Sequence, residues 1–445
     1  MQFTDDQRMY WKKIVEDHFD KALLKAYVPE LDNNDRFHSG KVRDNYAIGR
    51  NKELYLSIAS DRISAFNFKL GTMPFKGQML NQMTTFFFEQ TRDLVPNAFL
   101  ETFDPMGMVQ EKTQPVMLEG IVRAYLAGGA FRDFDQQKFV KSGIDMRDYL
   151  TDFKKNEQFS QLLFTPSEKS EHDPDISQEG AIAKGIVTQE EFEFLRDSLF
   201  SLFRYGQDYF SARGLILVDD KKEFGRKKDG SIVLIDELFT PDSSRYWLHD
   251  DYAAAYAAGR EPKQLSKEFL RDIILRNGYD PESQKKLAVT REMLVDTTVQ
   301  YIELYQLFTG KEFVPDLEDS AVRLNRNLVT NDVIKGKYAV LVTDSYNDYQ
   351  DVVKAQLKIL KVPFQTIAYE NGSSRQRDHE QLRQRLDTDL ARYNDSITPM
   401  SIILLDSNGT TLTESRNPRV RYLRLGSHDI VGKIDSEAFE RKLFS

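Results

Sequence analysis

The sequence predicts an α/β protein in which a large N-terminal part is followed by a smaller parallel α/β domain. The 445 residues include 30 Phe and 20 Tyr and are 40% hydrophobic, so the chain can bury a sizeable core. Short β-like runs and helical stretches of mixed order fill the first 330 residues. From about residue 335 strands and helices alternate, which is typical of a small flavodoxin-like or Rossmann-like unit.

Charge and composition exclude several classes of protein. The chain has 61 Lys+Arg against 70 Asp+Glu, a net charge of −9, which disfavours a nucleic-acid partner. No run approaches 18 apolar residues, so we expect no membrane span, and without a targeting signal we expect a cytoplasmic protein. With no Cys and only six His, a bound metal needs carboxylate ligands, which points to Mg²⁺.

The first 190 residues are predicted to be mixed. An apolar stripe indicates a helix within residues 1–37, and β-like runs at 54–59 and 115–125 flank a helix at about 78–91. Residues 130–187 are polar, which predicts loops and short elements around a cleft.

Two later helices carry clear end signals. Thr188 followed by Glu191 forms a capping box, apolar residues recur at helical spacing, and Gly214 ends the helix. Residues 262–327 again look helical, and Gly310 closes one helix there. The apolar stripes of these helices are predicted to be core.

The C-terminal region is predicted to contain strands at 338–342, 363–369, 401–405 and 420–425, with helices at 349–360 and 374–393. The polar stretch 325–336 is the predicted linker. We therefore divide the chain into a catalytic part, 1–330, with lobes of about 1–125 and 126–330, and a small α/β domain, 335–445.

The strongest chemical pattern surrounds a predicted two-residue hairpin turn at Asp229-Gly230. In that register Glu223 lies directly opposite Asp236. Period-two alternation then places Asp219 and Lys221 on the same face as these two acids. Two opposed carboxylates repel unless a cation lies between them.

Glu223 and Asp236 are therefore predicted to hold Mg²⁺, with Lys221 beside them for phosphate oxygens. Phe224 and Ile235 are predicted to face the core. The same pattern also fits a solvated hairpin face whose carboxylates are screened by neighbouring lysines.

Two further segments are candidates for anion binding. Ser243 and Arg245 follow the hairpin in a turn that suits a phosphate monoester, and an ordinary turn with an exposed Arg fits equally well. Lys41 and Arg43 precede a β-run next to Gly40, and two residues at this spacing face one side of a strand. A plain strand start is the alternative.

Two more polar segments lie near strand ends. Residues 60–67, including Ser64 and Asn67, form a polar turn after a buried strand. Arg123 lies near a glycine pair ending at Gly129, which suits an anion, although an edge-strand Arg beside a turn is the simpler reading. The combination of several anion sites with one carboxylate pair indicates an ATP-dependent enzyme with a phosphorylated second substrate.

These segments together resemble the SAICAR synthetase (phosphoribosylaminoimidazole-succinocarboxamide synthase) family. The likeness covers about residues 30–310, and a stretch like the usual end of longer members follows at 301–313. The matching motifs, in the family's order, are GKVRDNY (40–46), ASDRISAF (59–66), KGQMLNQM (76–83), EGIVRAYLAGG (119–129), FTPSEK (164–169), HDPDIS (172–177), LVDDKKEFG (217–225) and DELFTPDSSRYW (236–247).

The resemblance implies an α+β, two-lobed fold that clamps ATP between its lobes. It implies a ligase that joins CAIR and L-aspartate with ATP and Mg²⁺ to give SAICAR, ADP and phosphate in purine biosynthesis. The family mechanism activates the CAIR carboxylate as an acyl phosphate, which the aspartate amine attacks.

The resemblance also assigns roles to individual positions. Lys41, Arg43 and Lys221 would lie along the ATP phosphates, and Glu223 and Asp236 would hold Mg²⁺. The remaining matched positions face the substrates. They are Ser64, Asn67, Arg123, Gly129, Lys169, His172, Asp173, Ser243 and Arg245, of which Arg123, Ser243 and Arg245 would grip the CAIR phosphate.

Some positions depart from the family pattern. The family commonly has an acid at Asn67 and a Ser at Gly129, the loop from Lys169 to His172 is shorter, and Lys222 replaces an apolar or aromatic residue. A relative that ligates a different carboxylate or amine, and a non-catalytic nucleotide-binding regulator, are therefore alternatives. An AIR carboxylase domain follows this enzyme in some organisms, and VTDSYND (342–348) faintly resembles its first loop, but its glycine-rich loops are missing. The C-terminal module is predicted to be structural or regulatory.

Overall fold

The computed structural model describes residues 3–26, 28, 31, 37–48, 53–65, 68–170, 173–277, 279 and 289–330, and four further strands up to residue 425. Its contacts divide the chain into two units. One contains Met1–Lys25 and His38–Asp316, and the other contains Ala26–Phe37 and Leu317–Ser445. None of the helices in these described ranges is long and apolar enough to cross a membrane.

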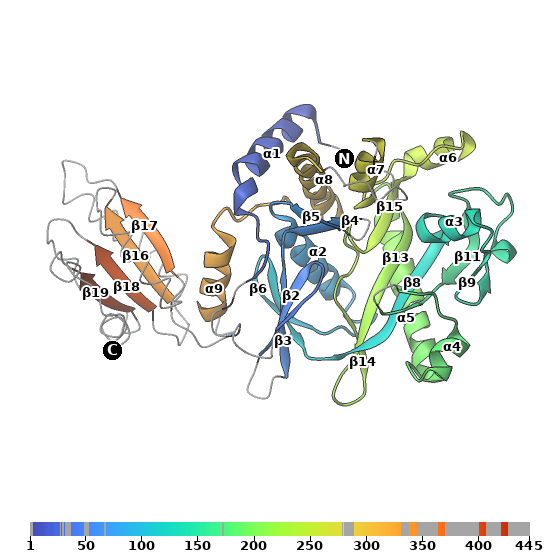
Figure 1. Cartoon of the computed structure of the whole chain (residues 1–445), viewed down its shortest axis with the longest axis horizontal. Helices are drawn as coiled ribbons and strands as arrows, with labels where there is room; N and C mark the ends of the chain where they lie inside the picture. Colours follow the sequence, from blue (N-terminus) through green and yellow to red (C-terminus); the bar gives the residue numbers. More distant parts are fainter. Residues whose placement is uncertain are drawn as a thin grey trace. The chain divides into compact units, whose positions relative to one another are not determined.

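The first unit contains two antiparallel sheets that follow one another along the chain (Figure 1). The first sheet has the order β1-β2-β3-β7-β6, and a separate β4–β5 ribbon follows β3. The predicted strand at 54–59 coincides with β3. The bounds are β1 Phe37–Ser39, β2 Arg43–Ile48, β3 Leu54–Ala59, β4 Arg62–Ala65, β5 Phe68–Thr72, β6 Phe99–Asp104 and β7 Gly107–Glu111.

The second sheet has the order β11-β8-β13-β14, with β12 added beside β8 and β15 beside β13. Its central strand β13 pairs with β8 on one side and with both β14 and β15 on the other. The bounds are β8 Gln114–Tyr125, β11 Gln158–Phe164, β12 Ser167–Glu168, β13 Leu215–Arg226, β14 Ile232–Ile235 and β15 Ser244–Leu248, with a small β9 Val140–Lys141 and β10 Ile144–Asp145 ribbon nearby in sequence.

Helices cover these sheets and form much of the core. The capping box of Thr188 and Glu191 begins α5 as predicted, and Gly310 ends α8 with a φ of 69°. The bounds in this unit are α1 Asp5–Asp17, η1 Phe19–Lys21, α2 Lys76–Gln90, α3 Gly128–Asp135, η2 Met146–Tyr149, α4 Gln178–Ala183, α5 Gln189–Ser211, α6 His249–Ala257, α7 Glu268–Arg276 and α8 Arg291–Thr309.

Aromatic side chains fill the core between α2, α5, α8 and the second sheet. Phe210 of α5 has ring contacts with Phe87, Phe239, Tyr246 and Phe308, with ring centroids 4.7–5.7 Å apart. Edge-on contacts of this kind add about 0.5–1.5 kcal/mol each beyond the burial of apolar surface. The core therefore fixes the second sheet against the helices and gives its exposed face a rigid support.

The second unit contains helix α9 and a parallel sheet in the order β17-β16-β18-β19. The four predicted C-terminal strands are confirmed, whereas both helices predicted between them lie outside the described residues. The linker predicted at 325–336 is wrong up to residue 330, because these residues continue a helix. The bounds are α9 Ser320–Thr330, β16 Tyr338–Asp344, β17 Phe364–Tyr369, β18 Met400–Leu405 and β19 Val420–Leu425.

Candidate functional site

Strand β13 presents charged residues on both of its faces. Asp219, Lys221 and Glu223 are partly exposed, whereas Asp220 and Lys222 between them are buried. This alternation follows from the period-two geometry of a strand. It confirms that Asp219, Lys221 and Glu223 share one face.

The predicted register of the β13–β14 hairpin is wrong by one residue. Glu223 pairs with Ile235 rather than with Asp236. The Lys227 amide donates to the Ser231 carbonyl at 2.8 Å, so three residues close the hairpin instead of two. Gly230, with a φ of 89°, supplies the left-handed residue that such a three-residue loop needs.

This shift moves Asp236 just beyond the end of β14, where its backbone is left-handed with a φ of 67°. It also places Ile235, predicted to face the core, opposite Glu223. The predicted core position of Phe224 is confirmed, because it is buried. The sequence missed the shift because the turn Asp229-Gly230 fits both loop lengths.

Asp236 nevertheless lies close to Glu223. Its side chain is 43% exposed. Partial removal from water and, as the smaller cause, the negative charge of Glu223 raise the pKa of the Asp236 carboxyl. Arg43 opposes this rise, with its Nε 3.5 Å from Asp236 Oδ1. Glu223 and Asp236 are not paired across the hairpin. The bend after β14 nevertheless brings their two carboxylates close together.

Lysines surround Glu223 and neutralise a second acid that sequence analysis missed. Glu119 of β8 lies directly across from Glu223. The Lys221 Nζ atom contacts Glu119 Oε1 at 2.8 Å and Glu223 Oε1 at 3.9 Å, while Lys169 forms an ion pair with Glu223 Oε2. Glu119 and Arg123 are separated by an even number of positions on β8, so they share a strand face. This spacing was the signal in the sequence that could have identified Glu119.

The donor set fits a small hard cation. Asp236 and Glu223 offer oxygen ligands only, and the charge of Glu223 disfavours the ionised form of Asp236, which a bound cation would oppose. Mg²⁺ usually takes one or two protein carboxylates and completes its shell with water and substrate phosphates. Within the described ranges, no group of three or more His, Cys, Asp or Glu residues is arranged as a metal cage.

Two arginines converge on the same side of the sheet. Arg123 of β8 and Arg245 of β15 each donate from Nη1 to Asp219 Oδ2 at 3.0 Å. Arg123 also donates from Nε to Thr165 Oγ1 at 2.9 Å. Burial lowers the pKa of Arg123, and the nearby positive charge of Arg245 adds to this effect. Two guanidinium groups thus converge on one carboxylate oxygen.

The glycine pair that opens α3 lies against these arginines. Gly128 has a φ of 54°, and a Cβ there would lie 2.2 Å from Arg245 Nη1. At Gly129 a Cβ would meet nothing closer than Arg132 Nη2 at 3.5 Å. The left-handed backbone favours glycine at position 128, and a side chain there would displace the Arg245 guanidinium, whereas position 129 has room for a Cβ.

The turn after β14 is anchored to the buried side of β13. Ser243 accepts a hydrogen bond from the Lys222 ammonium at 3.4 Å, and its carbonyl accepts from the Lys221 amide at 3.0 Å. Lys222 is fully buried and forms an ion pair with Asp220, which also accepts from the Ser244 hydroxyl. Sequence reasoning gave this buried pair no role, because the long-range contact with the turn was not visible.

Lys41 and Arg43 do not share a strand face as predicted. Lys41 lies in the bend before β2 with an exposed side chain, whereas Arg43 is 4% exposed. The Arg43 side chain donates to Thr84 at 3.3 Å and lies 3.9 Å from Glu237. Arg43 therefore braces the Asp236 region from beneath.

A buried ion pair holds the Lys41 bend. Arg62 binds Asp44 through two nitrogens, at 3.0 and 2.9 Å. The same guanidinium donates to the carbonyls of Gly40 and Lys41 at 3.1 and 3.3 Å. The family motifs contain both residues, but their pairing could not be read from the sequence.

The other predicted substrate positions are less connected. Ser64 is half-buried in β4, and Asp173, with a φ of 43°, accepts from the Ser170 amide at 3.2 Å. Within the described ranges, neither side chain has a hydrogen bond or ion pair to the β13 cluster. Asn67 and His172 lie outside the described residues.

Comparisons with known proteins agree on one family. The family model described as SAICAR synthetase matches residues 36–286. A phosphoribosylaminoimidazole-succinocarboxamide synthase of Flavobacterium psychrophilum is 39% identical over 303 residues, which cover 67% of this chain and 94% of that protein. One of the same name from Bacteroides thetaiotaomicron is 40% identical over 315 residues, covering 69% and 98%.

A solved structure supports the same relationship. The SAICAR synthase from Saccharomyces cerevisiae in complex with SAICAR superimposes with a TM-score of 0.56 and 27% identity. It covers 66% of this chain and 100% of that chain. The matched part corresponds in size to the first unit.

Proposed function

The chain belongs to the SAICAR synthetase family, and on that premise we propose that the charged cluster around β13 is its catalytic site. The chain is an ATP-dependent ligase that joins CAIR and L-aspartate to give SAICAR, ADP and phosphate in purine biosynthesis. The single observation that carries the site assignment is the convergence of four carboxylates, two lysines and two arginines at one face of the second sheet.

The two ends of this face suit different anions. The end with Glu223, Asp236 and Lys221 is assigned to the ATP phosphates, and the exposed Lys41 extends it. Glu223 and Asp236 would hold Mg²⁺, which would supply positive charge against the phosphates during phosphoryl transfer. Arg43 positions Asp236 rather than touching ATP, because its guanidinium is buried against Asp236 and Glu237.

The other end of the face is assigned to CAIR. Arg123 and Arg245 would turn from Asp219 to the ribose phosphate. The Ser243 hydroxyl, which accepts a hydrogen bond from Lys222 in this structure, would have to rotate to join them. Ser64, Asn67, Gly129, Lys169 and Asp173 remain assigned to the substrate side.

The reaction needs an activated carboxylate, because a free carboxylate is a poor electrophile. In the proposed sequence a CAIR carboxylate oxygen attacks the γ-phosphorus, the bond to the β-phosphate oxygen breaks, and ADP leaves. The amine of L-aspartate then attacks the acyl carbon, loses a proton, and expels inorganic phosphate as the amide bond forms. The protein contributes positioning and charge neutralisation through its lysines and arginines.

The second unit is proposed to be a small parallel α/β domain with a structural or regulatory role. Its four parallel strands support this fold, since parallel strands need crossover connections.

One measurement tests both the site and the substrate. ADP release by the purified chain is followed with CAIR, ATP and Mg²⁺ while the amine is varied. L-Aspartate-dependent turnover is expected. Turnover only with another amine would show a relative of changed specificity, and ATP binding without turnover under any pairing would show a non-catalytic nucleotide-binding protein.

A further inference from the structure

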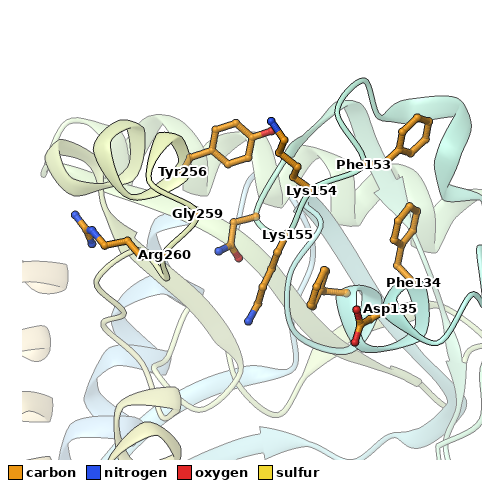
Figure 2. A pocket seen from close by; sticks show the side chains of 10 residues that line it. Phe134, Asp135, Phe153, Lys154, Lys155, Tyr256, Gly259 and Arg260 are labelled. Atoms are coloured by element: carbon orange, nitrogen blue, oxygen red, sulfur yellow. The ribbon is translucent and has the colours of Figure 1, made fainter.

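A cavity of about 440 Å³ lies outside the β13 cluster (Figure 2). Its volume lies within the range of small-molecule sites. Figure 2 shows Phe134 and Phe153 on one side of it and Tyr256 and Arg260 on the other. The lining residues are Phe131, Phe134, Asp135, Phe153, Lys154, Lys155, Asn156, Tyr256, Gly259 and Arg260.

A buried amide in this cavity lacks one hydrogen bond. Asn156 is 3% exposed, and its Oδ1 atom has no hydrogen-bond partner. Its Nδ2 group donates to Glu261 Oε2 at 3.3 Å, and this contact fixes which end of the amide is the unpaired one. A buried acceptor without a partner destabilises the fold, because it has lost its hydrogen bond to water. The site therefore calls for an N–H or O–H donor from a ligand.

Aromatic rings form the walls around this acceptor. The rings of Phe134 and Phe153 are nearly parallel, at 14° with centroids 6.2 Å apart. The Phe153 side chain is 52% exposed, so it is available to a ligand. Tyr256 stands opposite and is held by a hydrogen bond from its hydroxyl to Asp152 at 3.0 Å. Such walls suit a planar aromatic molecule.

The segment that presents Phe153 is pre-organised. The buried Glu157 carboxylate accepts backbone N–H bonds from Thr151, Asp152 and Lys154, at 2.5, 2.9 and 3.2 Å. Phe153 itself has a φ of 55°, a conformation unfavourable for a bulky side chain. Strain of this kind persists only where the surrounding structure holds it. Here Glu157 supplies that restraint, and the exposed ring gains nothing for the core in return.

The charges at the cavity are balanced in pairs. Each cationic lining residue has a carboxylate partner, so the cavity does not select an anion. The pairs are Lys154–Asp152 at 3.8 Å, Lys155–Glu261, and Arg260–Asp251 at 2.5 Å. The remaining lining carboxylate, Asp135, is exposed and suits ligand hydroxyl groups.

We propose that this cavity binds an uncharged heteroaromatic amine of nucleoside size. The amino group of the ligand donates to Asn156 Oδ1, its ring packs against Phe153, and its hydroxyl groups reach Asp135. The site is separate from the ATP and CAIR positions, because none of its lining residues belongs to the β13 cluster.

Adenosine is the probe, titrated calorimetrically into the full chain. Saturating Mg–ADP is present so that the ATP position is occupied. Saturable adenosine binding is expected, and purine riboside, which lacks the amino group, is expected to bind about tenfold more weakly because Asn156 Oδ1 stays unpaired. Calorimetry of Mg–ADP itself reports separately on the proposed function.

Two glycine variants separate binding from folding. Phe153→Gly removes the ring and relieves the left-handed backbone, so adenosine affinity should fall about tenfold while the denaturation midpoint does not fall. Gln137→Gly is the matched control, since Gln137 is also exposed with a φ of 61° but does not line the cavity. It should keep the affinity of the unsubstituted chain.

Three results would overturn the proposal: no saturable adenosine binding in the presence of Mg–ADP, equal affinity for purine riboside, or unchanged affinity in Phe153→Gly. Failure of the chain to bind Mg–ADP would instead contradict the proposed function, and the adenosine titration would still decide on the cavity.

Discussion

The two faces of β13 show the same residue types in opposite settings. On the exposed face, Lys221 lies between the carboxylates of Glu119 and Glu223. On the buried face, Lys222 is paired with Asp220 and is fully enclosed. An exposed pair exchanges partners with water and ligands, whereas a buried pair cannot lose either partner without a large cost. Adjacent residues therefore form an accessible ion pair on one face, where we propose the chemistry takes place, and an enclosed ion pair on the other.

The largest expected effect on activity comes from a substitution at the exposed face of β13. Asp236→Asn should lower kcat/KM by about 1,000-fold, or about 4 kcal/mol, because it removes one of two proposed Mg²⁺ ligands. Folding stability should change little, because the Asp236 side chain is 43% exposed. Steady-state kinetics and urea denaturation measure the two effects. Asp229→Asn, in the exposed hairpin turn, is the control. Equal activity in the two variants would show that Asp236 is not part of the catalytic site.

A substitution on the buried face of β13 should lower the stability of the fold. Lys222→Met leaves Asp220 as an unpaired buried charge and should lower the free energy of unfolding by about 3–5 kcal/mol. Adding Asp220→Asn should restore at least half of this loss, because the uncompensated charge disappears. Urea denaturation of the single and double variants measures the difference. A double variant no more stable than the single one would show that the pair is not the cause.

A smaller effect is expected where the exposed face meets α3. Gly128→Ala should displace Arg245 and raise the KM for CAIR about tenfold, with less change in kcat. Gly185→Ala is the matched control, since Gly185 has a similar φ of 68° and its Cβ would meet nothing within 4 Å. Substrate-saturation curves for both variants measure the difference. Equal KM values would show that Arg245 does not take part in CAIR binding.

The smallest effect is a pH dependence. Since burial and Glu223 raise the pKa of Asp236, its carboxyl takes up a proton at a higher pH than an ordinary aspartate. Mg²⁺ affinity should therefore be full above this raised pKa and fall as the pH drops through it, by at most tenfold per pH unit for one proton. Calorimetric Mg²⁺ titrations of the chain with ADP across acidic pH measure this. A constant affinity down to pH 4 would contradict it.

Sequence signals that involve residues a few positions apart predicted helix ends correctly. Thr188 and Gly310 mark helix ends because caps depend on residues a few positions apart. The hairpin register was wrong by one residue because Asp229-Gly230 fits two loop lengths. A slip of this size reverses which face a side chain takes, and this is how Ile235 came to be placed in the core.

The candidate site could be predicted only in part. The motifs identified Glu223, Asp236 and Arg123, and the structure brings the first two together and places Arg123 beside Arg245. The ion pair of Lys169 with Glu223 spans 54 positions in the sequence. Contacts of this kind depend on the fold as a whole, so spacing rules do not reveal them.

The single oxygen of Asp219 shared by Arg123 and Arg245 has a consequence for turnover. If the two arginines bind the substrate phosphate as proposed, this oxygen acts as an internal stand-in for the phosphate, and both guanidinium groups keep their orientation between catalytic cycles. An arriving substrate would then exchange one anion for another and gain only the difference in free energy. Binding at this end would thereby be kept moderate, and the departing product would be replaced by a group that never leaves the protein.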